Sequence, residues 1–297
     1  MRRPAHWYEV AHAGTDLPVL LPSARELART AGNERSSGHF ALRLRAEHGI
    51  ALLLLFVVGC GIAQAQAGAT DPAILATLWK WTPVLLQGFM FNLAISVMAM
   101  AGGTVAGVLL GFAQSSLLPP VRGSAWVVTQ FFRNAPWLVL LFYCMFLLPF
   151  QVTVFGVTIP IPDWIKATFG LALPVMANVS EVLRGAVQSI PTGQWESAAS
   201  LAFTRRQTMW KIILPQCIKR MLPPWMNLYA ILTMATVLTS IVGVAEIMTL
   251  TARVLSAENR PGLLLAFYSY VLLLFFIYCY PIARWTVRLE ARYAVDR

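Results

Sequence analysis

The sequence predicts an all-α integral membrane protein with about six transmembrane helices, on three observations. Of its 297 residues, 58% are hydrophobic and only 12% are charged, whereas soluble domains carry roughly a quarter charged residues. The apolar residues gather in long runs that short polar stretches separate. Lys and Arg are distributed unequally between alternate stretches. A water-soluble core could not hide this much apolar surface, so a lipid bilayer is the expected surrounding.

The distribution of positive charge predicts the orientation of the chain. The net charge is +10, and 19 of the 23 Lys and Arg lie in stretches that would share one side of the membrane. The alternate loops hold only Lys80, Lys166, Arg253 and Arg260. Cytoplasmic loops carry an excess of Lys and Arg, so both termini and the polar stretch 181–220 are expected in the cytoplasm. This pattern accounts for the basic charge, and no nucleic-acid partner is expected.

The N-terminal part predicts three elements before the main transmembrane domain. Residues 1–48 are polar and basic and predict a cytoplasmic tail. Residues 49–70 carry no charge and predict an additional first span, although "VVGC" and "AQA" within them also resemble processing sites for a cleaved leader. Asp71 and Pro72 suit the start of a short amphipathic helix that would occupy 71–83 on the periplasmic side.

Five further spans are expected within a transmembrane domain over 84–285, and residues 286–297 are expected to form a cytoplasmic tail. The spans are predicted at 84–112, 129–149, 164–187, 224–249 and 262–284. In the span 84–112, Gly103, Gly107 and Gly111 recur every four residues. Such a face allows another helix to approach closely, whereas simple tolerance of glycine against lipid is the alternative.

A polar, helix-forming stretch over 189–216 interrupts the apolar runs. Thr192 is predicted to cap a first short helix, "GQWESAASLAF", with Glu196 in its first turn. Thr204 to Gln207 form a capping-box sequence that predicts a second short helix, "RRQTMWKIILPQ". The two helices would meet at a corner near 202–204. This compact surface would dock a partner protein, or else lie on anionic lipid.

The segment "QWESAASLAFTRRQTMWKIILPQ" resembles the EAA loop of permease subunits of ABC importers. The flanking "EVLRGAVQSIPTGQ" and "LPPWMN" are similar to the polar amino acid branch of that family, and residues 133–136 resemble its R-G-T-P. The sequence departs from the pattern with Ala202 at the glycine of the corner, Ser197 at an alanine, and "MATVL" where the branch often has K-D-T-S-L. Alanine in a left-handed backbone would cost on the order of 1 kcal/mol.

The resemblance implies that the loop forms a coupling helix that docks on a cytoplasmic ABC ATPase. It also implies a bacterial inner-membrane location, a second permease subunit that is identical or related, and a periplasmic solute-binding protein that delivers a small polar solute, foremost an amino acid. The implied docking residues are Gly193, Glu196, Ser197, Ala198, Leu201, Ala202, Arg205, Arg206, Ile212, Leu214 and Pro215.

No catalytic residue, cofactor or metal is expected in this chain. It has no GxxxxGK[ST] loop for nucleotide phosphates, so ATP and Mg are expected on the partner ATPase. The cysteines are isolated, without the CxxC spacing of a zinc site. They are Cys60, Cys144, Cys217 and Cys279.

Polar residues within the spans are the candidates for a translocation path. They are Asn92, Asn134, Asn178, Glu181, Arg184, Thr233, Thr236, Thr239 and Ser240. Glu181 and Arg184 are spaced to pair on one helix face, in a pair that serves the path or only anchors the helix. The hydroxyls would line the path or bond to their own helix carbonyls. Pro174 would loosen the helix near Asn178, for gating or packing. Glu246 is expected as a carboxylate at the outer interface, rather than as a contact for the binding protein or a gate.

Two other function classes remain open at this point. An ion-coupled secondary transporter would place acidic or histidine side chains deep in the spans, but all four histidines lie in the N-terminal tail. A non-transporting membrane scaffold would not require a structured loop at 189–216. A membrane enzyme is the least favoured class, because the sequence contains neither a nucleophile–base arrangement nor a metal cluster.

Overall fold

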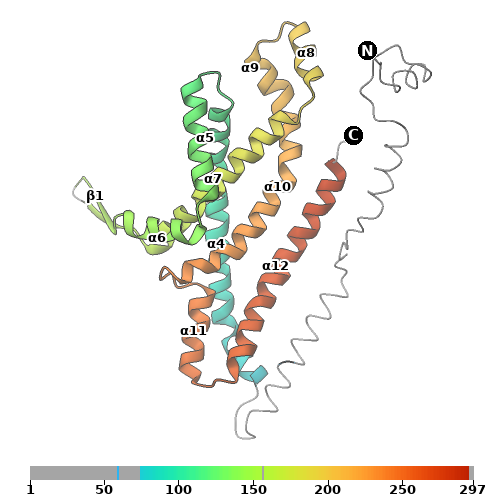
Figure 1. Ribbon diagram of the computed structural model, residues 1–297. Coiled ribbons are helices and arrows are strands. Elements are labelled where there is room, and N and C mark those ends of the chain that lie inside the picture. Colours follow the sequence, from blue (N-terminus) through green and yellow to red (C-terminus); the bar gives the residue numbers. More distant parts are fainter. Residues whose placement is uncertain (1–58, 60–73, 156, 294–297) are drawn as a thin grey trace, which may run out of the picture. The chain divides into compact units, whose positions relative to one another are not determined.

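The computed structural model describes residue 59 and residues 74–155 and 157–293, all within one compact unit, Leu52–Arg297 (Figure 1). The predicted tail 1–48, the helix start at Asp71 and most of the predicted first span lie outside the described residues. The elements are α4 (Ile74–Gln114), α5 (Pro119–Asn134), α6 (Trp137–Leu147), β1 (Gln151–Val154), β2 (Val157–Pro160), α7 (Asp163–Gln188), α8 (Thr192–Ser200), α9 (Arg205–Thr208), the π-helical η1 (Met209–Ile213), α10 (Leu214–Ala235), the 3₁₀ helix η2 (Thr236–Ser240), α11 (Ile247–Glu258) and α12 (Leu263–Tyr293).

The prediction of an all-α membrane protein is confirmed. Within the described residues, three helical segments are long and apolar enough to cross a bilayer: Ile74–Gln114, Arg205–Ser240 and Leu263–Tyr293. Helix α7 has 26 residues, which is also long enough, but it carries four charged side chains. Its bounds agree closely with the predicted span 164–187.

Helix α4 corrects the prediction of a separate amphipathic helix over 71–83. The described part of that segment is continuous with the predicted span 84–112 and forms one helix of 41 residues. At 1.5 Å per residue this helix is about 60 Å long, roughly twice the thickness of the hydrocarbon core. The apolar sequence continues through Pro83 without a capping signal, so the helix does not end there. Likewise, α12 continues past the predicted end at 284 to Tyr293.

The predicted third span, 129–149, is wrong as a single helix. The helix α5 ends at Asn134, and α6 begins at Trp137. Ala135 between them is extended, with φ −73° and ψ 136°. The physical reason is Pro136, because proline disfavours the helical conformation of the residue before it and cannot donate a backbone hydrogen bond. Residues 133–136 therefore mark a break between two helices.

The predicted fifth span, 224–249, is also divided. A continuous helical run begins at Arg205 and ends at Ser240, and α11 begins only at Ile247. In the break, Gly243 has φ +93°, a conformation that side-chain-bearing residues rarely adopt. The segment 205–216 is therefore the first part of a long helix, and the prediction of a second short helix was wrong in that respect.

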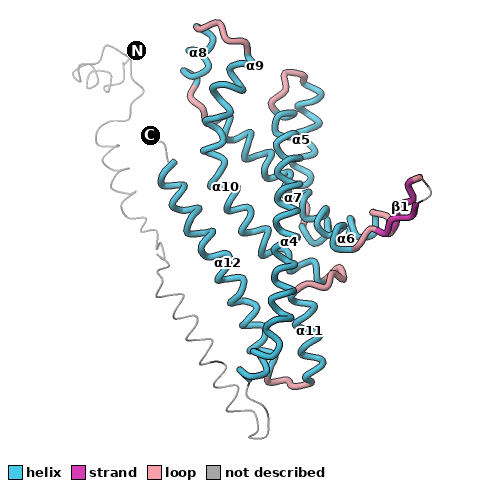
Figure 2. Tube along the Cα trace, turned by 180° about the vertical axis from the view of Figure 1, so that it is seen from behind, coloured by secondary structure: helices cyan, strands magenta, loops and turns pink. Residues whose placement is uncertain are grey.

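A two-stranded antiparallel hairpin, β1–β2, was not predicted. It pairs Gln151 with Pro160 and Val154 with Val157, and it projects away from the helices (Figure 2). Each strand contains three consecutive β-branched residues, which favour strands. Phe155 lies in the turn between them and has a left-handed φ of +50°. Each strand has only four residues, which is too short for the sequence pattern to distinguish a strand from the end of an apolar helix.

The glycine face of α4 packs directly on α7, which confirms the prediction of close approach. A Cβ at Gly103 would lie 2.5 Å from Cγ1 of Val175, and one at Gly107 would lie 2.6 Å from the carbonyl oxygen of Met176. The cluster of buried residues around this contact includes Ile95, Leu171 and Val175, with contributions from α6 and α10. Only hydrogen fits at these positions, so the two helices are held at the shortest distance their backbones allow.

Some of the connections between helices lie at two opposite ends of the described structure (Figure 1). The α4–α5 turn, the loop with α8 and α9, and the C-terminal end of α12 lie at one end. The start of α4 and the turn between α11 and α12 lie at the opposite end.

Gly107→Ala is expected to lower the stability of the protein by about 1–3 kcal/mol, because its Cβ would clash with backbone of α7. Gly102→Ala is the matched control, since a Cβ there meets nothing within 4 Å. The control is expected to keep or raise stability, as alanine favours helix. Thermal denaturation of the detergent-purified protein, followed by fluorescence size exclusion, measures both. Equal midpoints for the two variants would contradict the packing interpretation.

Candidate docking loop and polar clusters

The corner between α8 and α9 has a left-handed backbone at one position, where the sequence has alanine instead of the usual glycine. Ala202 has φ +57°. The N–H of Phe203 donates to the carbonyl of Ala198 at 3.1 Å, and the N–H of Ala202 donates to that of Ala199 at 2.9 Å. This is the Schellman pattern, whose left-handed position usually holds glycine. The predicted left-handed corner is therefore present, and alanine occupies it.

The second half of the corner is a capping box, as predicted. The Thr204 hydroxyl accepts from the N–H of Gln207 at 3.3 Å, and the Gln207 side-chain oxygen accepts from the N–H of Thr204 at 2.9 Å. The prediction that Thr192 caps the first helix was wrong. Pro191 occupies the N-cap position without a side-chain hydrogen bond, and Thr192 is the first helical residue. The extended backbone of Pro191, with φ −54° and ψ 142°, ends the helix on its N-terminal side.

The loop is anchored to the rest of the protein by a buried apolar cluster. Ala186, Ile190, Ile213 and Cys217 form it, and Trp195 packs against it from α8. Arg220 adds a polar tie, because its Nη1 donates to the carbonyl and to Oγ of Ser189 at 2.7 and 2.9 Å. Through these contacts α8 is packed against the end of α7 and the start of α10.

Most of the predicted docking residues lie on the exposed surface of this anchored loop. Leu201 is 71% exposed, although it is a large apolar side chain. Ala198 is buried under the corner, and Ile212 and Leu214 are half-buried. The exposed members are Gly193, Glu196, Ser197, Leu201, Ala202, Arg205, Arg206 and Pro215. The surface therefore combines an apolar tip with two guanidinium groups and one carboxylate.

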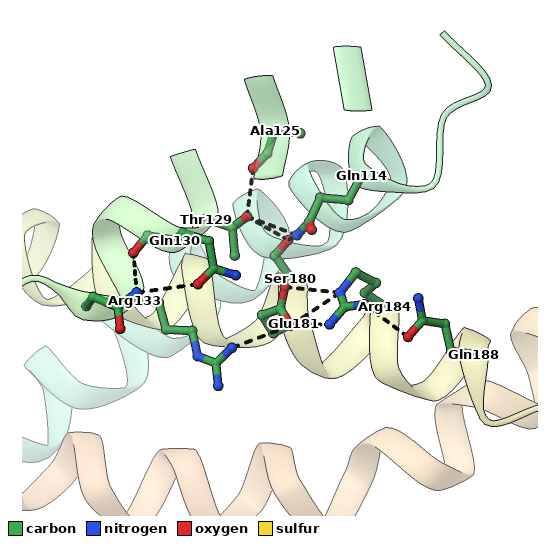
Figure 3. Close-up of polar contacts among 10 residues, drawn as sticks. Gln114, Ala125, Thr129, Gln130, Arg133, Ser180, Glu181, Arg184 and Gln188 are labelled. Atoms are coloured by element: carbon green, nitrogen blue, oxygen red, sulfur yellow. Dashed lines mark hydrogen bonds and ion pairs between the residues drawn. The ribbon is translucent and has the colours of Figure 1, made fainter. Parts of the chain in front are cut away.

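A second polar cluster surrounds Glu181 on α7 (Figure 3). Arg184 binds its carboxylate with both Nε, at 3.1 Å, and Nη2, at 2.8 Å. Arg133 at the end of α5 approaches the same carboxylate, with Nη1 3.5 Å from Oε2. The predicted Glu181–Arg184 pair is thus present, and a second guanidinium ties it to α5. Arg184 also donates to Gln188 at 3.0 Å.

Gln114, Thr129 and Ser180 connect α4, α5 and α7 beside this ion pair. Nε2 of Gln114 donates to Oγ1 of Thr129 at 2.9 Å and to Oγ of Ser180 at 2.6 Å (Figure 3). All three side chains are buried. The sequence reasoning missed this group, although an uncharged amide at the end of a long apolar helix was a signal that could have found it.

A third cluster holds the break between η2 and α11. Nδ2 of Asn92 donates to Oγ1 of Thr236 at 3.0 Å and to Oε2 of Glu246 at 2.9 Å, and Oδ1 accepts from the N–H of Ile247 at 3.1 Å. The other oxygen of Glu246 accepts from the N–H groups of Met248 and Thr249. Glu246 is fully buried, so the expected outer-interface carboxylate is wrong. It caps α11, where the positive end of the helix dipole favours its charge.

The remaining predicted path residues bond locally. The hydroxyls of Thr233, Thr236, Thr239 and Ser240 each donate to a carbonyl three or four residues earlier. Of the two alternatives for these hydroxyls, the structure therefore shows bonds to carbonyls of their own helix. Asn178 donates to the carbonyl of Pro174 at 2.8 Å, and Asn134 donates to that of Gln130 at 2.7 Å. A role in lining a path stays a prediction for all of them.

The described residues contain no group of three or more His, Cys, Asp or Glu that could hold a metal ion. The interactions that these clusters make are hydrogen bonds and ion pairs. Neither the loop nor the clusters pair a nucleophile with a base.

The sequence matches a family described as "binding-protein-dependent transport system inner membrane component" over residues 103–288. The glutamine transport system permease protein GlnP of Escherichia coli K12 is 33% identical over 172 residues, which are 58% of this chain and 77% of GlnP. The inner membrane amino-acid ABC transporter permease protein YhdY of the same organism is 30% identical over 210 residues, 71% of this chain and 56% of YhdY.

Solved structures share the fold. A crystal structure of an amino acid ABC transporter with histidines superposes with a TM-score of 0.63 at 24% identity, covering 75% of this chain and all of that one. An inward-facing structure of the MetNI methionine ABC transporter gives a TM-score of 0.55 at 18% identity, covering 73% of this chain and 99% of that one.

Ala202→Gly is expected to stabilise the corner by about 1 kcal/mol, because glycine adopts the left-handed conformation without the steric cost of a Cβ. Ala199→Gly, at an exposed position inside α8, should destabilise by a similar amount. Hydrogen exchange of the amides of 198–204 reads out both effects. If both variants shift the hydrogen-exchange protection of these amides in the same direction, the interpretation that Ala202 is strained is wrong.

Asn92→Leu is expected to destabilise the protein by about 2–4 kcal/mol, because it leaves the N–H of Ile247 unpaired and removes a donor from buried Glu246. Asn178→Leu is the comparison and should cost about 1 kcal/mol, since that amide makes one bond to a carbonyl. Chemical denaturation in detergent measures both. A smaller loss for Asn92→Leu than for Asn178→Leu would contradict the assigned role.

Proposed function

Because the chain belongs to the family of binding-protein-dependent transport system inner membrane components, we propose that it is the permease subunit of an ATP-driven importer for an amino acid. The names of its relatives support the class of solute, since they transport amino acids, glutamine in the case of GlnP. The family consists of transport components rather than enzymes. ATP hydrolysis, with ATP and Mg, belongs to separate ABC ATPase subunits.

The observation that carries this proposal is the loop with α8 and α9. It presents an exposed apolar side chain, Leu201, flanked by Arg205, Arg206 and Glu196. It is also held to α7 and α10 by the buried cluster around Ile213. A surface that must bind a moving partner and pass its motion to the spans requires both properties. The loop is therefore the coupling element between ATPase and membrane domain.

The basic end of the described helices faces the cytoplasm in this proposal. Arg122, Arg205, Arg206 and Arg288 lie in the segments that gather at that end (Figure 1). The excess of Lys and Arg follows the positive-inside rule. The C-terminus is cytoplasmic, and the start of α4 and the α11–α12 turn are periplasmic. The subunit resides in a bacterial inner membrane, and a periplasmic binding protein delivers the solute.

The path runs between this chain and a second permease, identical or related. Within the single chain, Thr236 and Thr239 are buried and their hydroxyls bond to backbone carbonyls. Glu181 and Arg184 remain partly accessible and charged, and they are the better candidates for contact with a zwitterionic solute. Conformational change at the loop would reach this pair through α7, which carries both.

Glu196→Lys is expected to abolish or weaken co-purification of an ABC ATPase from the native host, because the exposed carboxylate lies on the docking surface. Glu290→Lys makes the same charge change at an exposed site on α12 and should leave the ATPase bound. Mild-detergent affinity purification with mass spectrometry measures the ratio of ATPase to permease, with a loss of at least about tenfold expected for one charge reversal.

The proposal fails if folded wild-type protein brings down no ATPase. The docking role of Glu196 fails if both variants lose the ATPase equally. Any second permease found with the wild type identifies the pairing. Uptake of radiolabelled amino acids by the reconstituted complex then identifies the solute.

A further inference from the structure

A cavity of about 370 Å³ lies between the C-terminal end of α4, the start of α5 and the C-terminal end of α7. It is adjacent to the Glu181 cluster of Figure 3 but is formed by other side chains as well. Its principal lining residues are Gln114, Arg122, Trp126, Arg184, Val187 and Gln188. The docking and path roles discussed above use neither Arg122 nor Trp126.

Gln114 brings an unused acceptor to this cavity. The residue is 5% exposed, and its Oε1 has no hydrogen-bond partner in the described part of the chain. The Thr129 hydroxyl donates to the carbonyl of Ala125 at 2.9 Å and accepts from Nε2 of Gln114. With Nε2 facing Thr129 and Ser180, Oε1 is the amide atom without a partner. A buried acceptor without a donor is costly.

The cavity also carries excess positive charge. Three guanidinium groups, those of Arg122, Arg133 and Arg184, lie in or next to it, and among the described residues Glu181 is the carboxylate paired with them. Glu181 binds Arg133 and Arg184, and no ion pair within the described part of the chain includes Arg122. A ligand that satisfies the cavity must therefore supply an anionic group for the guanidiniums and a hydroxyl or ammonium donor for Gln114.

The surroundings are those of a membrane interface. Trp126 is 53% exposed, and it lies on α5 beside exposed apolar side chains such as Val127 and Leu118. Tryptophan prefers the level of lipid headgroups, and basic pockets between helix ends on the cytoplasmic side bind anionic headgroups. The apolar face of α5 would then accommodate the acyl chains.

We propose that this cavity binds the headgroup of an anionic phospholipid of the phosphatidylglycerol type. The phosphate binds Arg122, and a headgroup hydroxyl donates to Oε1 of Gln114. The lipid would connect α4, α5 and α7 at the end of the molecule that carries the docking loop. This inference requires the membrane location of the chain and is independent of which solute the importer carries.

The test is native mass spectrometry of the full-length protein, with any co-purifying permease, titrated with lipids of identical acyl chains. Wild-type protein is expected to bind phosphatidylglycerol about tenfold more tightly than phosphatidylcholine. Arg122→Ala should lose about tenfold in that affinity. Arg288→Ala, which removes an exposed guanidinium from α12, should change it less than twofold. Equal binding of both lipids, or equal losses in both variants, would overturn the proposal.

A second comparison isolates Gln114. Phosphatidylmethanol has the charge of phosphatidylglycerol but no headgroup hydroxyl, so wild-type protein should bind it about three- to tenfold more weakly. Gln114→Leu should remove that difference between the two lipids, while retaining the preference of both over phosphatidylcholine. A difference that persists in Gln114→Leu would refute the hydroxyl contact.

A third arm separates a lipid from a soluble ligand with the same groups. Glycerol 3-phosphate and free glutamine each carry an anion and a donor. Neither is expected to displace phosphatidylglycerol from wild-type protein. If either one displaces the lipid, and does not bind to Arg122→Ala, the cavity is a site for a soluble solute and the lipid proposal is wrong.

Discussion

The close approach of α4 to α7 is the constraint on which the other contacts of the described chain depend. The backbone of α7 occupies the space that side chains at Gly103 and Gly107 would fill. This places Gln114 within reach of Ser180 and brings α5 into the same network through Thr129. In a bilayer the hydrophobic effect does not drive helices together, because lipid tails are as apolar as the side chains. Close packing of helix backbones is therefore a main source of helix association. The position of the docking loop follows from it, since α7 leads directly into α8.

The polar side chains within the apolar helices divide into two kinds. Asn92, Thr236 and Glu246 are buried and satisfy one another or the backbone, and they hold the break before α11 in place. Glu181 and Arg184 are partly accessible and share their charges with Arg133 from a neighbouring helix. The first kind stabilises a fixed geometry. The second kind lies where a small change in the angle between α5 and α7 would alter which guanidinium binds the carboxylate.

The sequence predicted those features that short-range chemistry determines. The capping box at Thr204, the left-handed corner and the glycine face of α4 were all readable, because each depends on a few neighbouring residues. The break at Pro136 carried a local signal as well, but the apolar runs on both sides outweighed it. The end of the helix at Ser240 carried only the single glycine Gly243 as a local signal, and the break is held by Asn92, which is 154 positions away from the Glu246 it binds. Burial of Glu246 was missed for the same reason.

The π-helical turn η1 has a consequence for how the docking surface relates to the spans. Leu214 donates to the carbonyl of Met209, five residues earlier, so this turn holds one residue more than an α-helical turn. In an α-helix each residue advances the angular position by about 100°. A helical wheel drawn continuously from Arg205 into α10 therefore places the loop residues about 100° from where they lie. Removing one residue between α9 and α10 would therefore turn the loop residues by about 100° relative to the face of α10 that packs on α7 and α12.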